Sequence, residues 1–460
     1  MPARLAVGLL SASMLAFGPV RPAGQTPDEA ALIARARAIH DRVITLDTHN
    51  DIDPAHFTPA CNYTMRLTTQ VNLPKMKEGG LDVSFMIAYV GQGPLTPAGY
   101  QRAYQETLAK FDAVHRLTEQ IAPQEIGLAL TPDDVRAIAR SGRKVAVIGI
   151  ENGYAIGLDI RRVKEFHDRG GRYMSLAHNG HSQLADSNTG EQNNQWLYGG
   201  LSPLGKQVIA EMNKWGVMVD VSHPSKGAMM QAVALSKAPI IASHSAARSL
   251  ANVSRNMDDE MLMALKQNGG VIQTVAFGGY VKTDSPARTR ALAALRKEFG
   301  VAAGRRGAGA VPTPAGGGGA TTSPPCPLDS GTPAAVAQNG PPGPALDRLA
   351  PERRAQYDER LAGIDARWPP ARPAVKDFVD HIDYLVKLIG VDHVGISSDF
   401  DGGGGIEGWN SAAETFNVTL ELVRRGYAEE QIARIWSGNL LRVWADAERV
   451  AREIQAGRGR

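Results

Sequence analysis

The stretch Val43-Ile44-Thr45-Leu46-Asp47-Thr48-His49-Asn50-Asp51 joins a short apolar and β-branched run to a polar tip. The run Val43–Asp47 is predicted to be a β-strand, because β-branched residues favour extended backbone. Side chains two residues apart in an extended segment point the same way, so His49 and Asp51 can reach one metal ion together. A His-x-Asp pattern alone is a weak indication of a metal site, and it needs support from the rest of the chain.

Seven further runs of the same kind follow, and helical stretches separate them. Eight strands, each followed by a helix, are what a (β/α)₈ barrel requires, so we predict one α/β domain with this TIM-like fold. A doubly wound open sheet is the alternative, but it would not need eight strands. The seven runs are Leu81–Tyr89, Val145–Ile150, Tyr173–Ala177, Val217–Val221, Pro239–Ala242, Gly270–Phe277 and Val394–Ser397, and the helical stretches between them include Tyr100–Ile121, Pro132–Arg140, Leu204–Trp215 and Asp258–Lys266.

A His, Asp or Glu residue ends six of the eight runs. In a barrel the carboxyl ends of all strands meet at one face, where active sites lie. Any single one of these residues is more simply interpreted as an ordinary polar residue at a strand end. Their coincidence predicts a functional site, and beyond the first run the residues concerned are Glu151, His178, His223, His244 and Asp399.

Five side chains form a candidate set of metal ligands: His49, Asp51, Glu151, His223 and His244. Nitrogen and carboxylate ligands without thiolates suit zinc best, with manganese, cobalt and iron as alternatives. Five ligands suggest two ions, and Glu151 would bridge an ion held by His49 and Asp51 to one held by His223 and His244. A hydroxide shared by both ions would be the nucleophile, because coordination lowers the pKa of water.

Three further residues would complete a hydrolase. His178 is suited to donate a hydrogen bond to a substrate carbonyl oxygen as negative charge develops there. Asp399 can take a proton from the water and pass it to the leaving amine; Asp401 competes for this role, since it faces the same way by the period of two. Arg255 can pair with a substrate carboxylate, and a salt bridge to the acidic pair at 258–259 is an equally good interpretation.

These segments resemble the membrane (renal) dipeptidase family, whose members are zinc hydrolases on a barrel fold. The resemblance covers most of the chain from about Ala38 to about Ala445, without a low-complexity segment described below. The matching stretches are His49-Asn50-Asp51, Gly149-Ile150-Glu151, Leu176-Ala177-His178, Asp220-Val221-Ser222-His223, Ser243-His244-Ser245-Ala246, Arg255-Asn256 with Asp258-Asp259, and Asp399-Phe400-Asp401-Gly402.

The resemblance implies a homodimeric dipeptidase with two zinc ions per subunit, bound by the five candidate ligands with the glutamate as the bridge. It also implies that His178 polarises the substrate carbonyl, that Arg255 binds the substrate carboxylate and that Asp399 transfers the proton. Members hydrolyse dipeptides, often with a D-residue at the carboxyl side, and some open β-lactam rings. The chain departs from the family at Asn179, where the mammalian pattern has a disulfide cysteine, and at Phe277, where the family has a substrate-contacting tyrosine.

Two other functions fit parts of the pattern. A related metal-dependent amidohydrolase acting on another amide or a lactone usually opens with His-x-His and often bridges its metals with a carbamylated lysine. The pairing of His49 with Asp51 and the glutamate at 151 argue against it. A non-catalytic zinc-binding envelope protein would need neither Asp399 nor His178, so we expect an enzyme, a metallo-dipeptidase.

The ends and the overall charge of the chain concern its location and partners. The 460 residues carry a net charge of +3, so we expect no nucleic-acid partner. Residues 1–23 are predicted to be a signal peptide, with Arg4, a mostly apolar run Leu5–Val20 and the small residue Ala23. A membrane anchor is the alternative, but the run is short for a span. We therefore expect a periplasmic or secreted protein, residues 24–460, without a membrane span.

Residues 302–345 are dense in Gly, Pro and Ala and interrupt the pattern between the seventh and eighth strands. Such a stretch buries too little apolar area to order itself, so we predict a flexible insertion on the catalytic face. We favour a tolerated surface loop over a substrate lid. The two cysteines, Cys61 and Cys326, can form one disulfide in an exported chain, although their spacing does not show it.

Overall fold

The computed structural model describes residues 27–301, 326–329, 346 and 349–457. The predicted signal peptide and most of the segment 302–345 lie outside the described residues. Within the described ranges, no helix is both long enough and apolar enough to cross a membrane.

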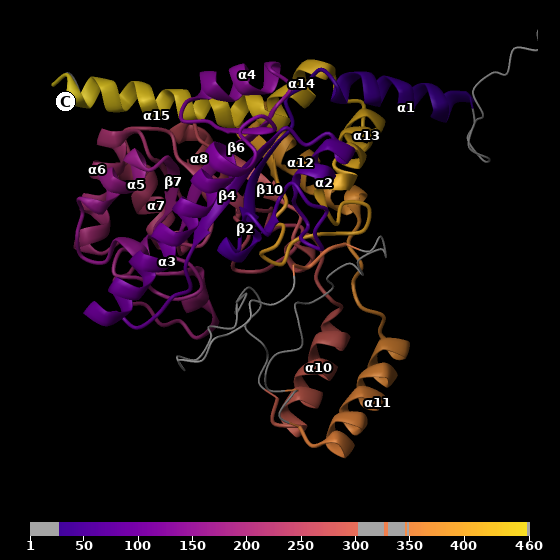
Figure 1. Cartoon of the computed structure of the whole chain (residues 1–460). Coiled ribbons are helices and arrows are strands. Elements are labelled where there is room, and N and C mark those ends of the chain that lie inside the picture. The colour runs from indigo at the N-terminus through magenta and orange to yellow at the C-terminus, as the bar shows by residue number, and fades with distance from the viewer. Residues whose placement is uncertain (1–26, 302–325, 330–345, 347–348, 458–460) are drawn as a thin grey trace, which may run out of the picture.

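Eight parallel strands form the barrel (Figure 1), which confirms the predicted fold class. The backbone N–H of Asp51 at the end of the first strand donates to the carbonyl of Phe400, just beyond the last strand, over 2.9 Å. The strands are β1 (Leu46–Asp51), β4 (Val83–Tyr89), β6 (Lys144–Glu151), β7 (Gly171–Ser175), β8 (Met218–Asp220), β9 (Ile241–Ser245), β10 (Val271–Val275) and β11 (Val394–Ser397), with β5 (Ile126–Leu128) beside β6 and a hairpin of β2 (Phe57–Thr58) and β3 (Cys61–Asn62) after β1.

Helices lie between the strands and surround the barrel (Figure 1). Several begin at a hydroxyl side chain followed by proline: Thr131 accepts a hydrogen bond from the N–H of Asp134, and Ser202 from that of Gly205. The helices are α1 (Pro27–His40), α2 (Leu73–Gly79), α3 (Pro97–His115), α4 (Pro132–Arg140), α5 (Arg162–Asp168), α6 (Pro203–Trp215), α7 (Lys226–Leu235), α8 (Asp259–Asn268), α9 (Gly278–Val281), α10 (Pro286–Glu298), α11 (Pro351–Arg367), α12 (Val375–Ile389), α13 (Phe416–Arg424), α14 (Glu429–Ala433) and α15 (Asn439–Gln455).

Side chains on the two faces of the strands belong to two different clusters of the hydrophobic core. Leu46, Phe85 and Val147 cluster with Leu440 and Trp444 of α15, and all five are buried. In Figure 1, α15 crosses one end of the barrel, while α10 and α11 project from the opposite end. The amino-terminal end of the barrel is thus filled by apolar side chains, and the carboxyl end remains for the polar strand tips.

The helices α10 and α11 form a hairpin of their own between β10 and β11. Leu295 and Phe299 at the end of α10 pack on Tyr357 of α11. The guanidinium of Arg288 is buried against the carboxylate of Asp365, with Nη1 2.7 Å from Oδ1. The chain between these two helices contains the Gly/Pro-rich segment.

A disulfide joins Cys61, the first residue of β3, to Cys326. Close to this bond, the backbone N–H of Asp329 donates to the carbonyl of Arg66 over 2.9 Å. Residues 326–329, which belong to the Gly/Pro-rich segment, are thereby fixed against the loop that follows the first strand.

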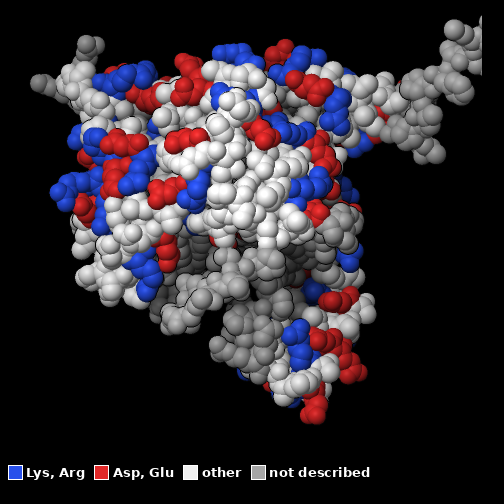
Figure 2. Space-filling view, in the orientation of Figure 1, with Lys and Arg blue, Asp and Glu red and all other residues white. Residues whose placement is uncertain are grey.

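Positive and negative side chains alternate on the face of the molecule in Figure 2. Over the described residues that this view shows, neither sign covers a broad continuous area.

Candidate metal centre

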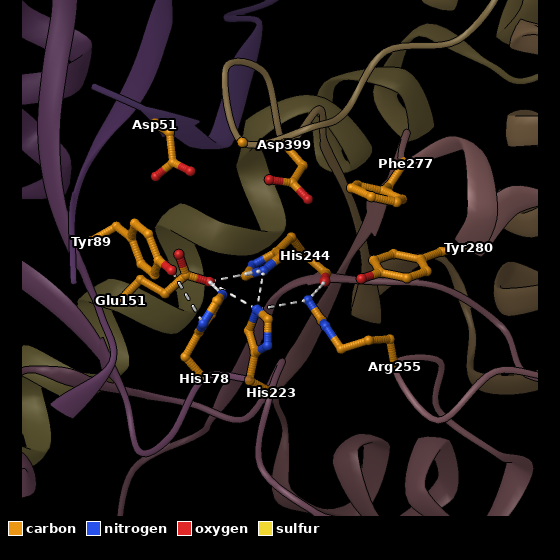
Figure 3. Close-up of a pocket in the computed structure, with 11 residues that line it drawn as sticks. Asp51, Tyr89, Glu151, His178, His223, His244, Arg255, Phe277, Tyr280 and Asp399 are labelled. Atoms are coloured by element: carbon orange, nitrogen blue, oxygen red, sulfur yellow. Dashed lines mark hydrogen bonds and ion pairs between the residues drawn. The ribbon is translucent and has the colours of Figure 1, made fainter. Parts of the chain in front are cut away.

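The polar residues predicted at the strand ends meet around one cavity (Figure 3). All eight strands of the barrel, or the loops that follow them, contribute to it, as expected at the carboxyl-terminal face of a barrel. His49 borders the same cluster, because its Nε2 lies 3.4 Å from Oε2 of Glu151. The lining residues are Asp51, Tyr89, Glu151, His178, His223, His244, Arg255, Phe277, Tyr280, Asp399 and Gly402.

Glu151, the last residue of β6, lies between His49 on one side and the pair His223 and His244 on the other. Its Oε1 is 2.8 Å from Nε2 of His223 and 3.3 Å from Nε2 of His244. Its Oε2 faces His49 instead, at 3.4 Å. The carboxylate therefore offers one oxygen to His49 and the other to His223 and His244.

Two further carboxylates, those of Asp51 and Asp399, lie close to His49. His49, Asp51 and Asp399 each offer a nitrogen or oxygen atom, and these atoms lie within 4.8 Å of one another. Oδ1 of Asp51 is buried and has no hydrogen-bond partner among the described residues. A buried carboxylate oxygen without a partner is costly, and a cation would satisfy it.

The charges of the cluster favour neutral imidazoles at His223 and His244 beside an ionised glutamate. Burial would lower the pKa of His49, but the carboxylates of Glu151, Asp399 and Asp51 raise it to about 9. Burial alone would raise the pKa of Glu151, but the surrounding imidazoles hold it well below its ordinary value. Burial, with nearby cations such as Arg255 adding to it, holds the pKa values of His223 and His244 well below the usual range. A neutral imidazole is the form that binds a metal ion, so the donor set suits a cation.

His178 enters the cavity from the loop after β7. Its Nε2 lies 3.7 Å from Oε1 of Glu151, and its Nδ1 lies 3.5 Å from the phenol oxygen of Tyr89. Burial lowers the pKa of His178 to about 4, although the charge of Glu151 opposes this. The side chain is therefore an uncharged imidazole near neutral pH.

The interpretation of Arg255 as a salt-bridge partner of the following acidic pair is wrong. Asp258 pairs with Lys226 instead, at 2.7 Å, and caps the first turn of α8. Asp259 accepts a hydrogen bond from the hydroxyl of Tyr384 over 2.7 Å. Both carboxylates are thus occupied on the surface side of the loop.

Arg255 itself turns into the cavity. Its Nη1 donates to the carbonyl of Ser222, and its Nη2 donates to the carbonyl of His244 over 3.0 Å. Its Nε is buried and has no hydrogen-bond partner among the described residues. The guanidinium is therefore held by backbone carbonyls while one N–H remains unsatisfied beside the histidines.

Asp399 and Asp401 do not face the same way, so the interpretation of Asp401 as a competitor is wrong. Asp399 lines the cavity, whereas the carboxylate of Asp401 accepts the N–H of Gln70 at 2.8 Å and that of Val71 at 3.2 Å. Both aspartates have a φ of 59°, the left-handed conformation. The period of two holds only for extended backbone, and this segment is a turn.

Two aromatic residues of the lining are absent from the sequence interpretation. Tyr89 is the last residue of a predicted strand run, and its position at the catalytic face was a usable indication. Tyr280 lies in the short helix α9, where no periodic pattern points to the site; it stacks on Phe277 with ring centroids 4.2 Å apart. The rings of Phe277 and Tyr280 lie on the side of the cavity next to Arg255, and Tyr89 lies on the opposite side, beside His178 (Figure 3).

Sequence comparisons agree with this geometry. The profile of the membrane dipeptidase family, peptidase family M19, matches residues 33–458. Dipeptidase aclJ of Aspergillus oryzae is 27% identical over 427 residues, which are 90% of this chain and 80% of that protein. Dipeptidase tcpJ of Claviceps purpurea is 26% identical over 393 residues, which are 84% of this chain and 72% of that protein.

Solved structures give the same result. The probable dipeptidase PvdM from Pseudomonas aeruginosa is 31% identical with a TM-score of 0.73, over 92% of this chain and 100% of that chain. A metallo peptidase from Rhodobacter sphaeroides, liganded with a phosphinate mimic of the dipeptide L-Ala-D-Ala, shares the fold at 18% identity with a TM-score of 0.62, over 88% of this chain and 99% of that chain. The chain belongs to the membrane dipeptidase family, peptidase family M19, and is a metallo-dipeptidase.

Proposed function

We propose that this enzyme holds two zinc ions in one site and hydrolyses free dipeptides. The observation that carries the proposal is the division of the Glu151 carboxylate. Oε2 faces His49, while Oε1 faces the pair His223 and His244. A carboxylate divided in this way is suited to bridge two cations.

His49 and Asp51 would hold one ion, and His223 and His244 the other, with Glu151 shared. Imidazole nitrogen and carboxylate oxygen without thiolates suit zinc. When bound, the ions lower the pKa of a water molecule and polarise the scissile carbonyl. The unpaired buried oxygen of Asp51 supports a cation at the first position.

Arg255 is suited to bind the carboxylate at the end of a dipeptide. Its Nη atoms are fixed by backbone carbonyls, so the group is already oriented, and its unpaired Nε–H is available for a substrate oxygen. A charge-assisted hydrogen bond of this kind in a buried site is stronger than one between neutral groups. This contact selects a substrate with a free carboxyl terminus.

His178 and Asp399 face the same cavity from different strand ends (Figure 3). Neutral His178 would donate a hydrogen bond to the substrate carbonyl oxygen as it gains charge. Burial raises the pKa of Asp399 to about 8; the charge of His49 opposes this rise, and those of Asp51 and Glu151 add to it. A carboxyl group whose pKa lies near neutrality can take a proton from water and return it to the leaving amine.

We also propose that the enzyme is exported to the periplasm or secreted, and that it acts as a homodimer. The disulfide between Cys61 and Cys326 supports export, because such bonds persist mainly in oxidising compartments. The apolar run Leu5–Val20 would serve as the signal peptide. The dimer rests on the family resemblance, and the molar mass in solution tests it.

Metal analysis of the purified protein together with a dipeptide screen tests the proposed function. We expect about two zinc ions per chain and release of both amino acids from L,L and L,D dipeptides, L-Ala-D-Ala among them. Carboxyl-amidated dipeptides are the control and should react poorly. A protein that holds no zinc, or that cleaves none of these dipeptides when zinc is supplied, contradicts the proposal.

A further inference from the structure

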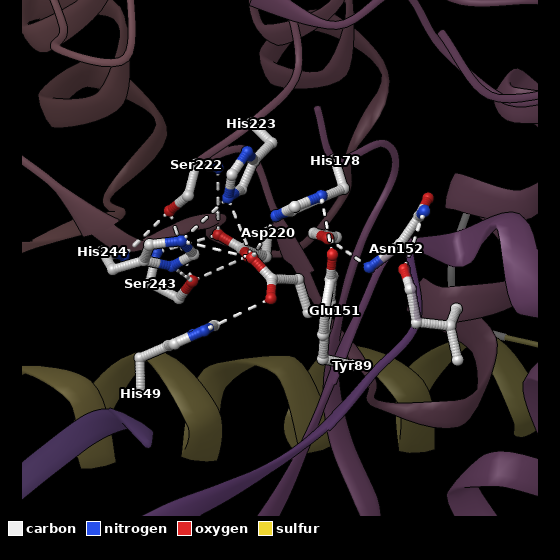
Figure 4. Close-up of polar contacts among 12 residues, drawn as sticks. His49, Tyr89, Glu151, Asn152, His178, Asp220, Ser222, His223, Ser243 and His244 are labelled. Carbon is white, nitrogen blue, oxygen red and sulfur yellow. Dashed lines mark hydrogen bonds and ion pairs between the residues drawn. The ribbon is translucent and has the colours of Figure 1, made fainter. Parts of the chain in front are cut away.

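Each of the three histidines proposed as metal ligands has its other ring nitrogen in contact with an outer side chain. Nδ1 of His49 lies 3.0 Å from the hydroxyl oxygen of Tyr173. Nδ1 of His244 lies 2.8 Å from the hydroxyl oxygen of Ser243 (Figure 4). For the third, His223, the contact is Oδ1 of Asn179 at 3.2 Å. We call Tyr173, Asn179 and Ser243 the outer partners.

The single hydroxyl proton of Tyr173 already takes part in another hydrogen bond. It is donated to the backbone carbonyl of Thr48 over 3.1 Å. A hydroxyl carries one proton, so the oxygen of Tyr173 can meet His49 only as an acceptor. Nδ1 of His49 must therefore carry a hydrogen, and its Nε2 is the atom left to face Glu151.

The hydroxyl proton of Ser243 likewise takes part in another hydrogen bond, in this case to a carboxylate. Its hydroxyl donates to Oδ2 of Asp220 over 2.7 Å, and Oδ1 of Asp220 accepts the backbone N–H of Ser243 over 2.8 Å. The hydroxyl oxygen then accepts the Nδ1–H of His244. Asp220, Ser243 and His244 form a buried chain of hydrogen bonds from a carboxylate to a ring nitrogen (Figure 4).

The barrel interior is shaped around Tyr173. Its ring crosses the strand β6 at Gly149, where a Cβ atom would lie 2.4 Å from Cζ of the ring. No side chain fits at position 149 without displacing the phenol. The hydroxyl group is thereby held next to His49, and the side chain of Tyr173 is fully buried.

His178 differs from the three other histidines. The hydrogen-bond partner of its Nδ1, within the described part of the chain, is the phenol of Tyr89 at 3.5 Å, the upper limit for such a bond. The histidines that would bind metal therefore have a hydrogen bond of 3.2 Å or less at the outer ring nitrogen, whereas His178, which would meet the substrate, does not.

We propose that Tyr173 and the Ser243–Asp220 pair are positioning residues for the two metal ions, Tyr173 for the ion on His49 and the pair for the ion on His244. Each fixes the ring orientation and the tautomer, so that the Nε2 lone pair faces the cation. This inference rests on the proposed binding of zinc. Outer hydrogen bonds of this kind typically change metal affinity by about 10- to 100-fold.

Zinc affinity of the metal-free protein, measured by competition with a chromophoric chelator, tests the proposal. Tyr173→Phe keeps the ring and removes the hydroxyl; we expect one of the two ions to bind about 10- to 100-fold more weakly and the other as before. Ser243→Ala and Asp220→Asn should weaken the other ion instead. Tyr104→Phe, which removes a hydroxyl that donates to Glu165 far from the cluster, is the matched control and should bind both ions normally.

The absorption spectrum of the Co²⁺-loaded protein gives a second readout, since it reports the geometry around each ion. Tyr173→Phe should change the spectrum of one ion only, while urea unfolding of the metal-free variant matches the unsubstituted protein. Unchanged zinc affinity in Tyr173→Phe and in Ser243→Ala would overturn the inference, and so would weakening of the same ion by both. If the unsubstituted protein binds no zinc, the proposed function fails instead.

Discussion

The rings of Tyr89 and His178 lie against each other, with centroids 4.7 Å apart and an interplanar angle of 58°. The phenol oxygen of Tyr89 approaches Nδ1 of His178 at 3.5 Å. The tyrosine ends β4 and the histidine follows β7, so two separate strands orient this imidazole. Packing of the rings, more than the long hydrogen bond, holds His178 towards the cavity.

Replacement of His178 by alanine should lower kcat by about 10²–10³-fold, because one donor to the developing oxyanion is lost. Zinc content should stay unchanged, since the side chain is not among the proposed ligands. Steady-state kinetics and metal analysis of the same preparation measure both. Tyr89→Phe is the comparison: it keeps the ring contact and should retain activity within about tenfold. Loss of zinc in His178→Ala would make this residue a ligand and contradict its assignment.

Asp399→Asn should keep both zinc ions and lose about 10²–10⁴-fold in kcat, because an amide cannot carry the proton from water to the amine. Asp401→Asn is the matched control, two residues away and chemically identical. Its carboxylate accepts backbone N–H groups of Gln70 and Val71, which the amide oxygen can still do in part. Near-normal turnover in Asp399→Asn would remove this residue from the proton-transfer role.

The positions of the candidate residues were predictable because barrel topology alone brings strand ends together. Each of the eight predicted runs overlaps a strand, and His223, three residues beyond β8, needs only the direction of that strand to reach the cluster. The orientation of Asp401 was not predictable, since it depends on two left-handed residues without glycine. Asparagine and aspartate tolerate that conformation, but composition does not say when they adopt it.

Contacts between residues that are distant in the sequence could not be predicted from the sequence either. The contact of Asn179 with His223 and the unsatisfied Nε of Arg255 depend on how loops from different strands pack. Helix boundaries show the same limit: the predicted helix Tyr100–Ile121 begins earlier, at Pro97, and its last residues, Arg116–Ile121, form a π-helical segment. Such a wide turn satisfies tertiary contacts that no local periodicity records.

Glu151→Gln should release metal while it preserves the shape of the site. The amide has the size of the carboxylate but brings no negative charge between the two cations, so zinc content should fall from about two ions to below about one per chain. Metal analysis after gel filtration measures this, and the metal-loaded Asp399→Asn variant is the control for a lost acidic group that is not a bridge. Full retention of both ions in Glu151→Gln would contradict the bridging role.

Arg255→Ala should weaken the reaction of free dipeptides far more than that of carboxyl-amidated ones. Removal of a buried charged hydrogen bond to a substrate typically costs about 2–5 kcal/mol, and only the free carboxylate makes that bond. The ratio of kcat/KM for a free dipeptide to that for its amide is the useful measure, because Nη2 of Arg255 also supports the carbonyl of His244 and general damage affects both substrates. An unchanged ratio would exclude Arg255 as the carboxylate-binding group.

His40 links α1 to the rest of the barrel in a way that requires a neutral ring. Nε2 donates to the carbonyl of Gly79 over 2.9 Å, and Nδ1 lies 2.7 Å from the hydroxyl of Thr419. That hydroxyl oxygen accepts the N–H of Trp436, so its own proton is available for Nδ1. Protonation of Nδ1 would break this bond, and burial accordingly lowers the pKa of His40, although the bond to Gly79 opposes this.

A lowered pKa in the folded state means that the unfolded chain binds the proton more tightly. The contribution of His40 to stability is therefore present above its unfolded pKa of about 6.5 and is lost as the pH falls below that value. The free energy of unfolding, measured with urea at about pH 7.5 and about pH 5.5, should drop on acidification. In His40→Gln, which keeps a donor for the carbonyl of Gly79 but does not titrate, the drop should be smaller. An equal drop in both proteins would mean that another group carries the acid sensitivity.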